Sequence, residues 1–185
     1  ANKLMRNNGD GTFTDFTSTA GVEGDQGGSH EACFGDFDDD GDMDLFIVNR
    51  SGTCLLYSNI REGKFRDVTK EVGLADIRTA TDVATADYNN DGYLDLFVAG
   101  SSPESWSWYL NTGNGVFTSD HAADTLFNQV KTFHLYDAAF FDFDNDGYLD
   151  LFVARYDVPG PNPIFHNNGD GTFTRVMEPS LQAIQ

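Results

Sequence analysis

Apolar and polar positions along this chain fall into short runs. Three runs are continuously apolar: LFIV at 45–48, LFVA at 96–99 and LFVA at 151–154. Each follows directly after an acidic segment, and each predicts a strand that is covered on both faces. Downstream segments such as CLLYSN end in Asn before a Gly-containing turn and a Phe, which is typical of a hairpin. Helical periodicity is weak throughout, and the single candidate helix is 121–131.

The same order of segments recurs about every fifty residues. Short segments with small residues (HEACFG, TDVATA, YDAAFF) precede the acidic loops, and the Gly turns lead to the equivalent residues Phe13, Phe65, Phe117 and Phe173. The chain's start, NKLMRNNGDGTFTDFT, matches the last part of the unit only. Each full unit therefore predicts four short strands, and such a four-stranded unit cannot bury both of its faces alone. Such units indicate an all-β fold of β-propeller-type four-stranded blades, about three and a half repeats, as a partial propeller or part of a larger assembly.

The repeats divide one domain, 1–185, into predicted segments. They are a half-blade at 1–19, blades at 29–70, 80–120 and 135–177, and a tail at 178–185. Three and a half units do not close a ring, since propellers have about four blades or more. Two explanations stay open: the chain is a fragment of a longer one, or protomers assemble head to tail through exposed strand edges.

The acidic loops carry the candidate chemistry. They read DFDDDGDMD at 36–44, DYNNDGYLD at 87–95 and DFDNDGYLD at 142–150. Oxygen-bearing side chains at positions 1, 3, 5 and 9, with Gly at position 6, form a Ca²⁺ ligand pattern. An EF-hand would need Glu at position 12, where this chain has Ile47 and two valines, so an EF-hand is excluded. The alternative is acidic turns without metal, but converging carboxylates would repel one another strongly without a cation.

In these motifs the chain resembles the FG-GAP or VCBS repeats, which are found in the propeller of integrin α chains and in many secreted bacterial proteins. The resemblance rests on D-x-[DN]-x-D-G-x-x-D-L-F-V, on N-N-G-D-G-T-F, and on the D-[VF]-T endings at Asp15–Thr17 and Asp67–Thr69. It covers nearly the whole chain. It departs at Trp106 and Trp108, at the TGNGVF turn, which lacks the Asp, and after Val176.

The resemblance implies three Ca²⁺ sites, each of which would join the first two strands of a blade and contribute folding free energy. The seventh position would contribute its backbone carbonyl and the others their side chains. The ligands that the resemblance assigns are Asp36, Asp38, Asp40, Asp42 and Asp44; Asp87, Asn89, Asp91, Tyr93 and Asp95; and Asp142, Asp144, Asp146, Tyr148 and Asp150. The aromatic residues at position 2, Phe37, Tyr88 and Phe143, are expected to pack between blades.

Composition narrows the function. The 185 residues carry 30 acids and 11 bases, a net charge of −19, which argues against nucleic acid and anionic membranes as partners. No apolar stretch approaches the ~18 residues of a spanning helix, so direct membrane insertion is not expected. The chain begins at Ala1 and has no recognisable signal peptide, which predicts a mature chain or a fragment.

The two cysteines, Cys33 and Cys54, do not resemble a zinc site. A disulfide between them would span roughly 10 Å, which favours two small buried thiols.

A few residues outside the loops are candidates for binding. Trp106, beside a Ser-rich segment, would stack on a sugar ring if it is exposed, and core packing is the alternative. Asn49 begins an N-x-S sequon that is expected to be exposed and is a candidate glycosylation site. The segments after the second strands, at 50–54, 100–106 and 155–162, should emerge on one face and meet a partner. The four histidines, which are expected to have surface or turn roles, are His30, His121, His134 and His166.

The leading hypothesis is a calcium-stabilised, non-catalytic module of a secreted or extracellular protein, with cell surface and periplasm both possible. It would serve adhesion, binding or assembly, and its partner would be a protein, a carbohydrate or other copies of itself. One alternative is a domain of a secreted carbohydrate-active enzyme or lectin, although no clustered acid, base or nucleophile lies off the repeats. The other alternative is a structural subunit that polymerises through its blade edges.

Overall fold

The computed structural model describes residues 2–24, 28–100, 106–120, 135–155 and 161–176. Within these ranges the chain forms three four-stranded antiparallel sheets and one two-stranded sheet. The half-blade contains β1 (Met5–Asn7) and β2 (Phe13–Asp15), followed by the helix α1 (Thr17–Ala20). The first blade contains β3 (Ser29–Gly35), β4 (Asp44–Asn49), β5 (Leu55–Asn59) and β6 (Phe65–Asp67). The second blade contains β7 (Ala80–Ala86), β8 (Asp95–Gly100), β9 (Ser107–Asn111) and β10 (Phe117–Ser119). The third blade contains β11 (Leu135–Phe141), β12 (Asp150–Arg155), β13 (Ile164–Asn167) and β14 (Phe173–Val176).

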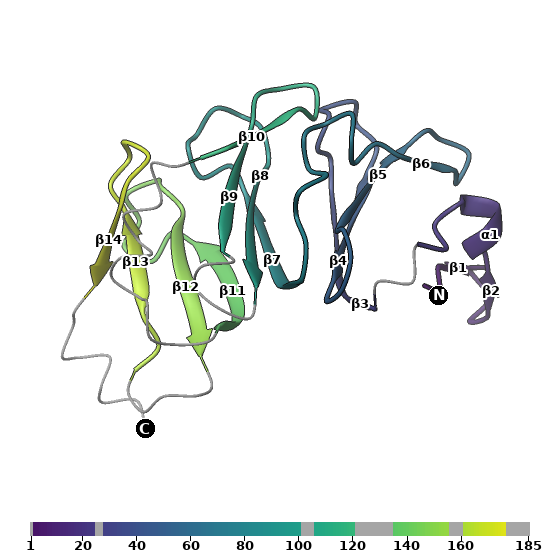
Figure 1. Cartoon of the computed structure of the whole chain (residues 1–185), viewed down its shortest axis with the longest axis horizontal. Coiled ribbons are helices and arrows are strands. Elements are labelled where there is room, and N and C mark those ends of the chain that lie inside the picture. Colours follow the sequence, from purple (N-terminus) through teal and green to yellow (C-terminus); the bar gives the residue numbers. More distant parts are fainter. Residues whose placement is uncertain (1, 25–27, 101–105, 121–134, 156–160, 177–185) are drawn as a thin grey trace.

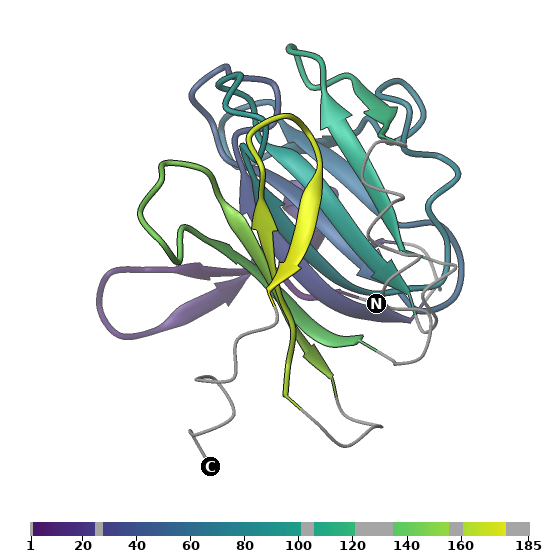
Figure 2. The same cartoon turned by 90° about the vertical axis from the view of Figure 1, so that its left-hand side faces the viewer.

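Each full blade is a simple meander in which neighbours in sequence are neighbours in the sheet. The blades follow one another in an open row, with the half-blade at one end and the third blade at the other (Figure 1). Figure 2 looks along this row from the side of the third blade and shows the sheets one behind another. The predicted all-β class and the four-stranded blade architecture are confirmed, and the sheets do not close into a ring. The candidate helix at 121–131 lies outside the described residues.

The continuously apolar runs form the second strand of each blade, as predicted. Every residue of β4 and β8 is buried. The reason is that the first and second blades are covered on both faces by neighbouring segments, and β4 and β8 lie in the interior of their sheets. Such a strand has no solvent face, so its sequence needs no alternation of polar and apolar residues.

The hydrophobic core consists of separate layers between successive blades. One layer joins the first and second blades and includes Phe37, Phe46, Leu56, Leu96 and Phe117. Another joins the second and third blades around Tyr88, Phe97, Trp108, Phe165 and Phe173. A smaller cluster, with Ala20, Val22, Leu45, Ile47 and Tyr57, joins the α1 segment to the first blade. A blade therefore gains its stability from its neighbours, as in other repeat architectures.

The Asp-x-Thr endings close the half-blade and the first blade in the same way. Asp15 Oδ1 accepts hydrogen bonds from the Thr17 amide at 3.1 Å and the Thr17 hydroxyl at 2.7 Å. Thr17 Oγ1 in turn accepts from the Leu4 amide at 2.9 Å. Asp67 and Thr69 repeat the first two bonds at 3.0 and 2.6 Å. The motif thus ties the end of the fourth strand to the neighbouring chain segment.

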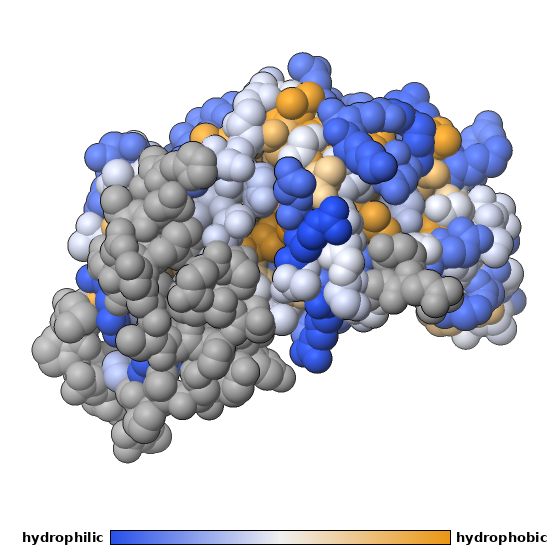
Figure 3. Space-filling view, in the orientation of Figure 1, coloured by the Kyte–Doolittle hydropathy of each residue, from blue (hydrophilic) through white to orange (hydrophobic). Residues whose placement is uncertain are grey.

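On the face shown in Figure 3, the visible described residues are mainly hydrophilic, with small separate apolar patches. No disulfide joins Cys33 and Cys54; Cys54 is buried and Cys33 is partly buried. Burial, followed by the charges of Glu31 and Asp82, raises the pKa of the Cys33 thiol to about 12. Within the described part of the chain, no helix has the length and apolar character needed to cross a membrane.

Candidate metal centres

The three acidic loops occupy the same place in each blade, between the first and second strands. The first loop joins β3 to β4, the second joins β7 to β8, and the third joins β11 to β12. The last Asp of each loop is the first residue of the second strand: Asp44, Asp95 and Asp150. A well-buried strand therefore holds one end of each loop in place.

Two left-handed residues give each loop its turn. The Gly at position 6 has a φ of 86° at Gly41, 93° at Gly92 and 91° at Gly147. A Cβ at these glycines would meet nothing within 4 Å, so backbone conformation and not space requires glycine there. Position 4 is also left-handed, with a φ of 59° at Asp39 and Asn90, and it is occupied by the residue types that tolerate this region best.

The carboxylate at position 1 stabilises the turn by accepting hydrogen bonds from its backbone amides. Asp36 accepts hydrogen bonds from the amides of Asp40 at 3.1 Å and Gly41 at 3.0 Å. Asp87 and Asp142 accept the corresponding amide bonds in the other two loops, at 2.8 to 3.1 Å. These bonds leave each oxygen a second lone pair, so the same carboxylate remains able to bind a cation.

The carboxylate at position 9 is buried and joins the loop to the third strand. Asp95 is 0% exposed; its oxygens accept from the Tyr88 amide at 3.3 Å and the Asn111 amide at 2.8 Å. Asp44 and Asp150 accept the equivalent pairs of bonds. Burial raises the pKa of Asp95 to about 7, partly offset by these amides and reinforced by Asp91 and Asp87. A buried carboxylate beside other carboxylates is a group that a cation would stabilise.

Positions 3 and 5 converge on position 1 in the first and third loops. Asp36, Asp38 and Asp40 can each place one oxygen within 4.8 Å of the others. Asp38 Oδ1 is buried and has no hydrogen-bond partner, and burial together with the charge of Asp40 raises the pKa of Asp38. Unpaired buried carboxylate oxygens of this kind fit the needs of Ca²⁺, which takes six to eight oxygen ligands.

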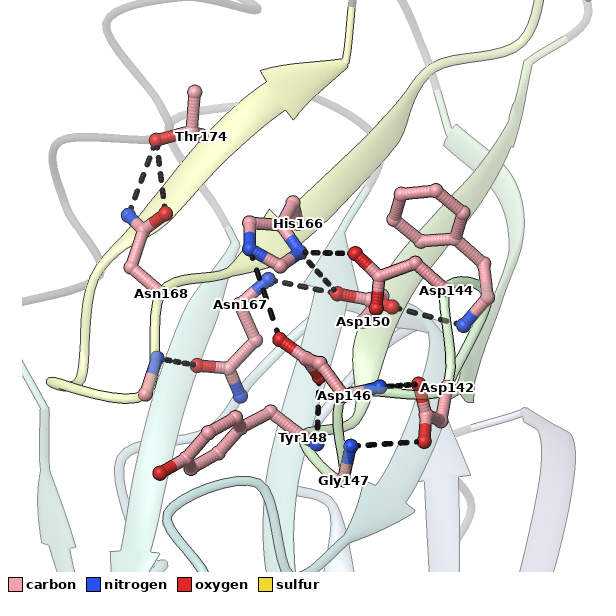
Figure 4. A network of polar contacts seen from close by, with 12 residues as sticks. Asp142, Asp144, Asp146, Gly147, Tyr148, Asp150, His166, Asn167, Asn168 and Thr174 are labelled. Carbon is pink, nitrogen blue, oxygen red and sulfur yellow. Dashed lines mark hydrogen bonds and ion pairs between the residues drawn. The ribbon is translucent and has the colours of Figure 1, made fainter.

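The third loop brings the same positions together and adds a histidine (Figure 4). Asp142, Asp144 and Asp146 form one group within 4.8 Å, and Asp144, Asp150 and His166 form another. His166 lies on β13, directly before Asn167, and its ring meets the Phe143 ring edge-on at 6.1 Å. Sequence reasoning gave His166 an ordinary surface or turn role and missed this position. Aligning the third strands would have revealed it, because Ser58 occupies the same place and its hydroxyl lies 3.4 Å from Asp38.

The second loop differs in its third position. Asn89 Oδ1 accepts from the Asp91 amide at 3.0 Å, and Asn89 Nδ2 lies 2.9 Å from Asp91 Oδ2. At positions 1, 3, 5 and 9 this loop therefore has one carboxylate fewer than each of its neighbours. Leu110, at the place of Ser58, packs against the apolar core and offers no ligand atom.

The residues at position 7 were assigned as backbone-carbonyl ligands, which stays a prediction. Their side chains point to other tasks. Asp42 pairs with Arg61 at 2.6 Å on the surface. The rings of Tyr93 and Tyr148 lie against Gly113 and Gly169, where a Cβ would come within 3.2 and 2.7 Å of them. The Gly residues of the hairpin turns therefore make room for these rings.

In the second and third blades, one asparagine links the blade's own acidic loop to the loop of the preceding blade. Asn111 Nδ2 donates to the Phe37 carbonyl of the first loop at 2.7 Å and to the Leu94 carbonyl of its own loop at 3.2 Å. Asn167 repeats this with the Tyr88 carbonyl at 2.7 Å. The position 2 rings complete the contact, since Phe37 packs on Phe117 with ring centroids 6.1 Å apart. The predicted packing of Phe37 and Tyr88 between blades is confirmed.

Two candidate sites outside the loops are corrected by the structure. Trp106 is 5% exposed and packs edge-on against Phe97 at 5.9 Å, so it offers no free face for a sugar ring. Asn49 is 0% exposed; its Nδ2 donates to the Thr53 carbonyl at 2.7 Å, and its Oδ1 accepts from Ser29 at 2.8 Å. The expected exposure of this sequon is wrong, because the following turn folds back onto the amide.

The remaining histidines lie away from the loops or outside the described residues. His30 Nε2 lies 2.6 Å from the guanidinium of Arg50. His121 and His134 fall in residues 121–134, which the structure does not describe. Most of the expected partner-facing segments at 100–106 and 155–162 also lie outside the described residues.

A row of acidic side chains runs across the first strands, which sequence reasoning overlooked. Glu31, Asp82 and Asp137 each follow a register shift in their strand. Glu31 Oε2 accepts from the Val83 amide at 3.2 Å, so it reaches from β3 to β7. Asp82 is 3% exposed; its burial, its contact with Glu31 and the charge of Asp137 raise its pKa to about 8. Cys33 also faces this pair. Because the pKa of Asp82 is raised, we expect the free energy of unfolding to fall as the pH rises.

Comparison with known proteins agrees with the repeat structure. A model of the FG-GAP-like repeat matches residues 1–47, 36–98, 87–153 and 142–184, and its matches overlap at the acidic loops and the strands after them. Cartilage acidic protein 1 of Homo sapiens is 30% identical over 180 residues, which is 90% of this chain and 26% of that protein. The Mus musculus protein of that name is 29% identical over 180 residues (90% of this chain, 27% of that protein). The Xenopus tropicalis protein is 30% identical over 169 residues (83% and 25%). The chain spans about a quarter of the length of these relatives.

Proposed function

Because the chain belongs to the FG-GAP-like repeat family, we propose that it is a calcium-stabilised, non-catalytic binding module of an extracellular protein. The observation that carries the proposal is the convergence of carboxylates in the loops, with Asp38 Oδ1 buried and unpaired. The relatives' name associates those proteins with cartilage and with acidity, and this chain has a net charge of −19. The association of the relatives with cartilage supports an extracellular location.

Calcium would act as a clamp between the first two strands of a blade. Positions 1, 3 and 5 belong to the turn, and position 9 belongs to the second strand, so an ion held by all four would fix the turn on the strand. The ion would also neutralise carboxylates that otherwise repel one another. Since the Asn111 side chain joins the first loop to the second, ordering of one loop would support its neighbour.

Calcium binding is tested loop by loop with a pair of charge-matched variants. Asp40→Asn removes a charge from a proposed ligand, whereas Asp39→Asn removes the same charge from position 4, where the second and third loops already have Asn. Equilibrium dialysis with ⁴⁵Ca²⁺ should find three ions per wild-type chain. Asp40→Asn should weaken one of them at least about tenfold, and Asp39→Asn should change it by less than about twofold. Equal effects of the two variants would refute a specific site in the first loop.

A second candidate function, assembly through the ends of the row, rests on a different observation. Phe13 is 59% exposed, whereas the equivalent Phe117 and Phe173 are 4% and 3% exposed because a preceding blade covers them. Phe37 covers the Phe117 ring and Tyr88 covers the Phe173 ring. The equivalent residue Phe143 belongs to the third blade, at the opposite end of the row. The two ends of this chain thus expose complementary halves of the inter-blade contact: the half-blade of a second copy would cover the Phe143 end, and a further blade of a longer chain would do the same.

Assembly is tested by light scattering after size-exclusion chromatography over a range of protein concentrations. Self-association that Phe13→Ser abolishes would support assembly, and a monomer at every concentration would exclude it. Ile60→Ser is the matched control, because Ile60 is also exposed, at 51%, and lies in the turn between β5 and β6 of the first blade.

A further inference from the structure

His166 distinguishes the third acidic loop from the other two. It occupies the place of Ser58 and Leu110, immediately before the Asn that holds the loop. Its Nδ1 lies 3.2 Å from Asp150 Oδ1 and 3.4 Å from Asp144 Oδ2. Neither contact is a well-aligned hydrogen bond: Nδ1 is buried and has no hydrogen-bond partner. Three potential ligand atoms therefore surround one point in the loop (Figure 4).

The spacing of these atoms suits a small divalent ion. Ligand atoms about 2.0–2.2 Å from a tetrahedrally coordinated zinc-type ion are about 3.3–3.6 Å apart. The observed 3.2 and 3.4 Å are close to that separation. Calcium has longer ligand distances and prefers an all-oxygen shell, which an imidazole interrupts. Imidazole is a preferred ligand of zinc, copper, iron and nickel, and two carboxylates complete a mixed set.

The surroundings hold the ring in place for this role. Asp146 Oδ2 lies 3.9 Å from Nε2, on the other side of the ring, where a carboxylate attracts and orients a metal-bound imidazole. The Phe143 ring meets His166 edge-on, and the Asn167 amide holds Asp150 at 2.8 Å. In the first loop the corresponding side chain is a hydroxyl, and in the second it is apolar. Neither of these loops offers a nitrogen ligand.

From this geometry we propose that the third loop, with Asp144, Asp150 and His166 as ligands, binds a borderline transition-metal ion such as Zn²⁺ or Co²⁺ in preference to Ca²⁺. The inference rests on the proposed metal-binding role of the loops, and it divides the sites into two kinds. The first two loops hold calcium, and the third is a mixed nitrogen and oxygen site. Under this proposal, calcium dialysis finds a third ion only when no zinc-type ion competes for that loop.

The test uses Zn²⁺ titrated calorimetrically into the whole chain in saturating calcium, with two reciprocal variants. His166→Ser copies the first loop and should weaken Zn²⁺ binding at least about tenfold. Leu110→His places an imidazole beside the second loop and should add a second Zn²⁺ per chain, which keeps the proposal testable if His166→Ser folds poorly. Replacement of Zn²⁺ by Co²⁺ should give a visible spectrum with a nitrogen ligand that is absent in His166→Ser.

The outcomes separate this inference from the calcium proposal. Zn²⁺ binding by wild type that His166→Ser abolishes, with two calcium ions retained, supports both. The same Zn²⁺ result without any calcium binding supports the inference and refutes the calcium proposal. Unchanged Zn²⁺ affinity in His166→Ser, or three calcium ions that Zn²⁺ fails to displace, overturns the inference and leaves the calcium proposal standing.

Discussion

The asparagine that links successive loops offers the sharpest test of how the blades stabilise one another. Replacing Asn111 by Ala removes the hydrogen bonds to the Phe37 carbonyl at 2.7 Å and the Leu94 carbonyl at 3.2 Å. It also removes the acceptor of the Gly113 amide at 3.1 Å. Asn111 is only 1% exposed, so water does not readily replace these partners.

The expected loss follows from these three bonds. Each is worth about 1 kcal/mol net, and a buried group left unpaired costs about 1–3 kcal/mol, so Asn111→Ala should destabilise the chain by about 2–4 kcal/mol. For a domain of this size, each kcal/mol lowers the melting temperature by about 2–4 °C, which gives a fall of about 4–16 °C. Circular dichroism in saturating calcium measures it, and urea unfolding gives the free energy independently.

Asn59→Ala is the matched control. Asn59 keeps the bond to its own loop, at 3.1 Å to the Met43 carbonyl, and the bond from the Arg61 amide at 3.0 Å. The half-blade before it has no acidic loop, so no bond to a preceding loop is made. Asn59→Ala should therefore cost about 1–2 kcal/mol. If it destabilises the chain as much as Asn111→Ala, the inter-blade bond contributes nothing, and the reasoning is refuted.

Three further predictions concern the acidic row, the inter-blade core and the loop turn. In the folded state the raised pKa keeps Asp82 protonated up to about pH 8, whereas in the unfolded state Asp82 ionises near its ordinary pKa of 3.8. Its contribution to the free energy of unfolding is therefore lost as the pH rises from about 4 to 8. Asp82→Asn should make the free energy of unfolding depend less on pH and should raise it at pH 8, as measured by urea unfolding. An unchanged pH dependence would contradict the raised pKa of Asp82. Phe117→Ala should cost about 3–5 kcal/mol, and Phe13→Ala, whose ring is 59% exposed, far less; similar losses would contradict the layered core. Gly92→Ala, at a φ of 93°, should lower the melting temperature in calcium by straining the turn, and an unchanged value would show that the loop adapts.

Much of the fold was predictable because the sequence repeats its local signals. The continuously apolar second strands, the Gly turns and the acidic loops each fix one part of a blade, and the structure places them in that order. The helix α1 was not predicted, since four residues are too few to show a period. Its end at Gly21, with a φ of 77°, is a local turn feature.

Tertiary contacts decide two positions that the local sequence pattern does not settle. The sequence left Trp106 undecided between sugar stacking and core packing, and the structure buries it in the layer between the second and third blades. Asn49 was expected at an exposed strand exit, but the chain turns back and buries it. Contacts between blades bury Trp106, whereas contacts within the first blade, with Ser29 and Thr53, bury Asn49.

Separation along the sequence explains why the ligand positions of the loops were recognised and His166 was not. The ligand positions were recognisable because all of them lie within nine consecutive residues. His166 is 16 residues beyond the third loop, and only the pairing of β12 with β13 brings it to Asp150. Asp82 and Glu31 come together through adjacent blades, so their proximity also needed the structure.

The central claim is that calcium in the acidic loops stabilises the blades, and calorimetric melting with and without a chelator tests it most directly. At free calcium about a hundredfold above the dissociation constant, each site should contribute about 2.7 kcal/mol. One such site corresponds to a rise in melting temperature of about 5–11 °C for a chain of this size. If calcium stabilises the blades, the melting temperature should fall by at least this amount in EGTA and should return to its original value when calcium is restored. An unchanged melting temperature, together with no bound metal in elemental analysis, would contradict it.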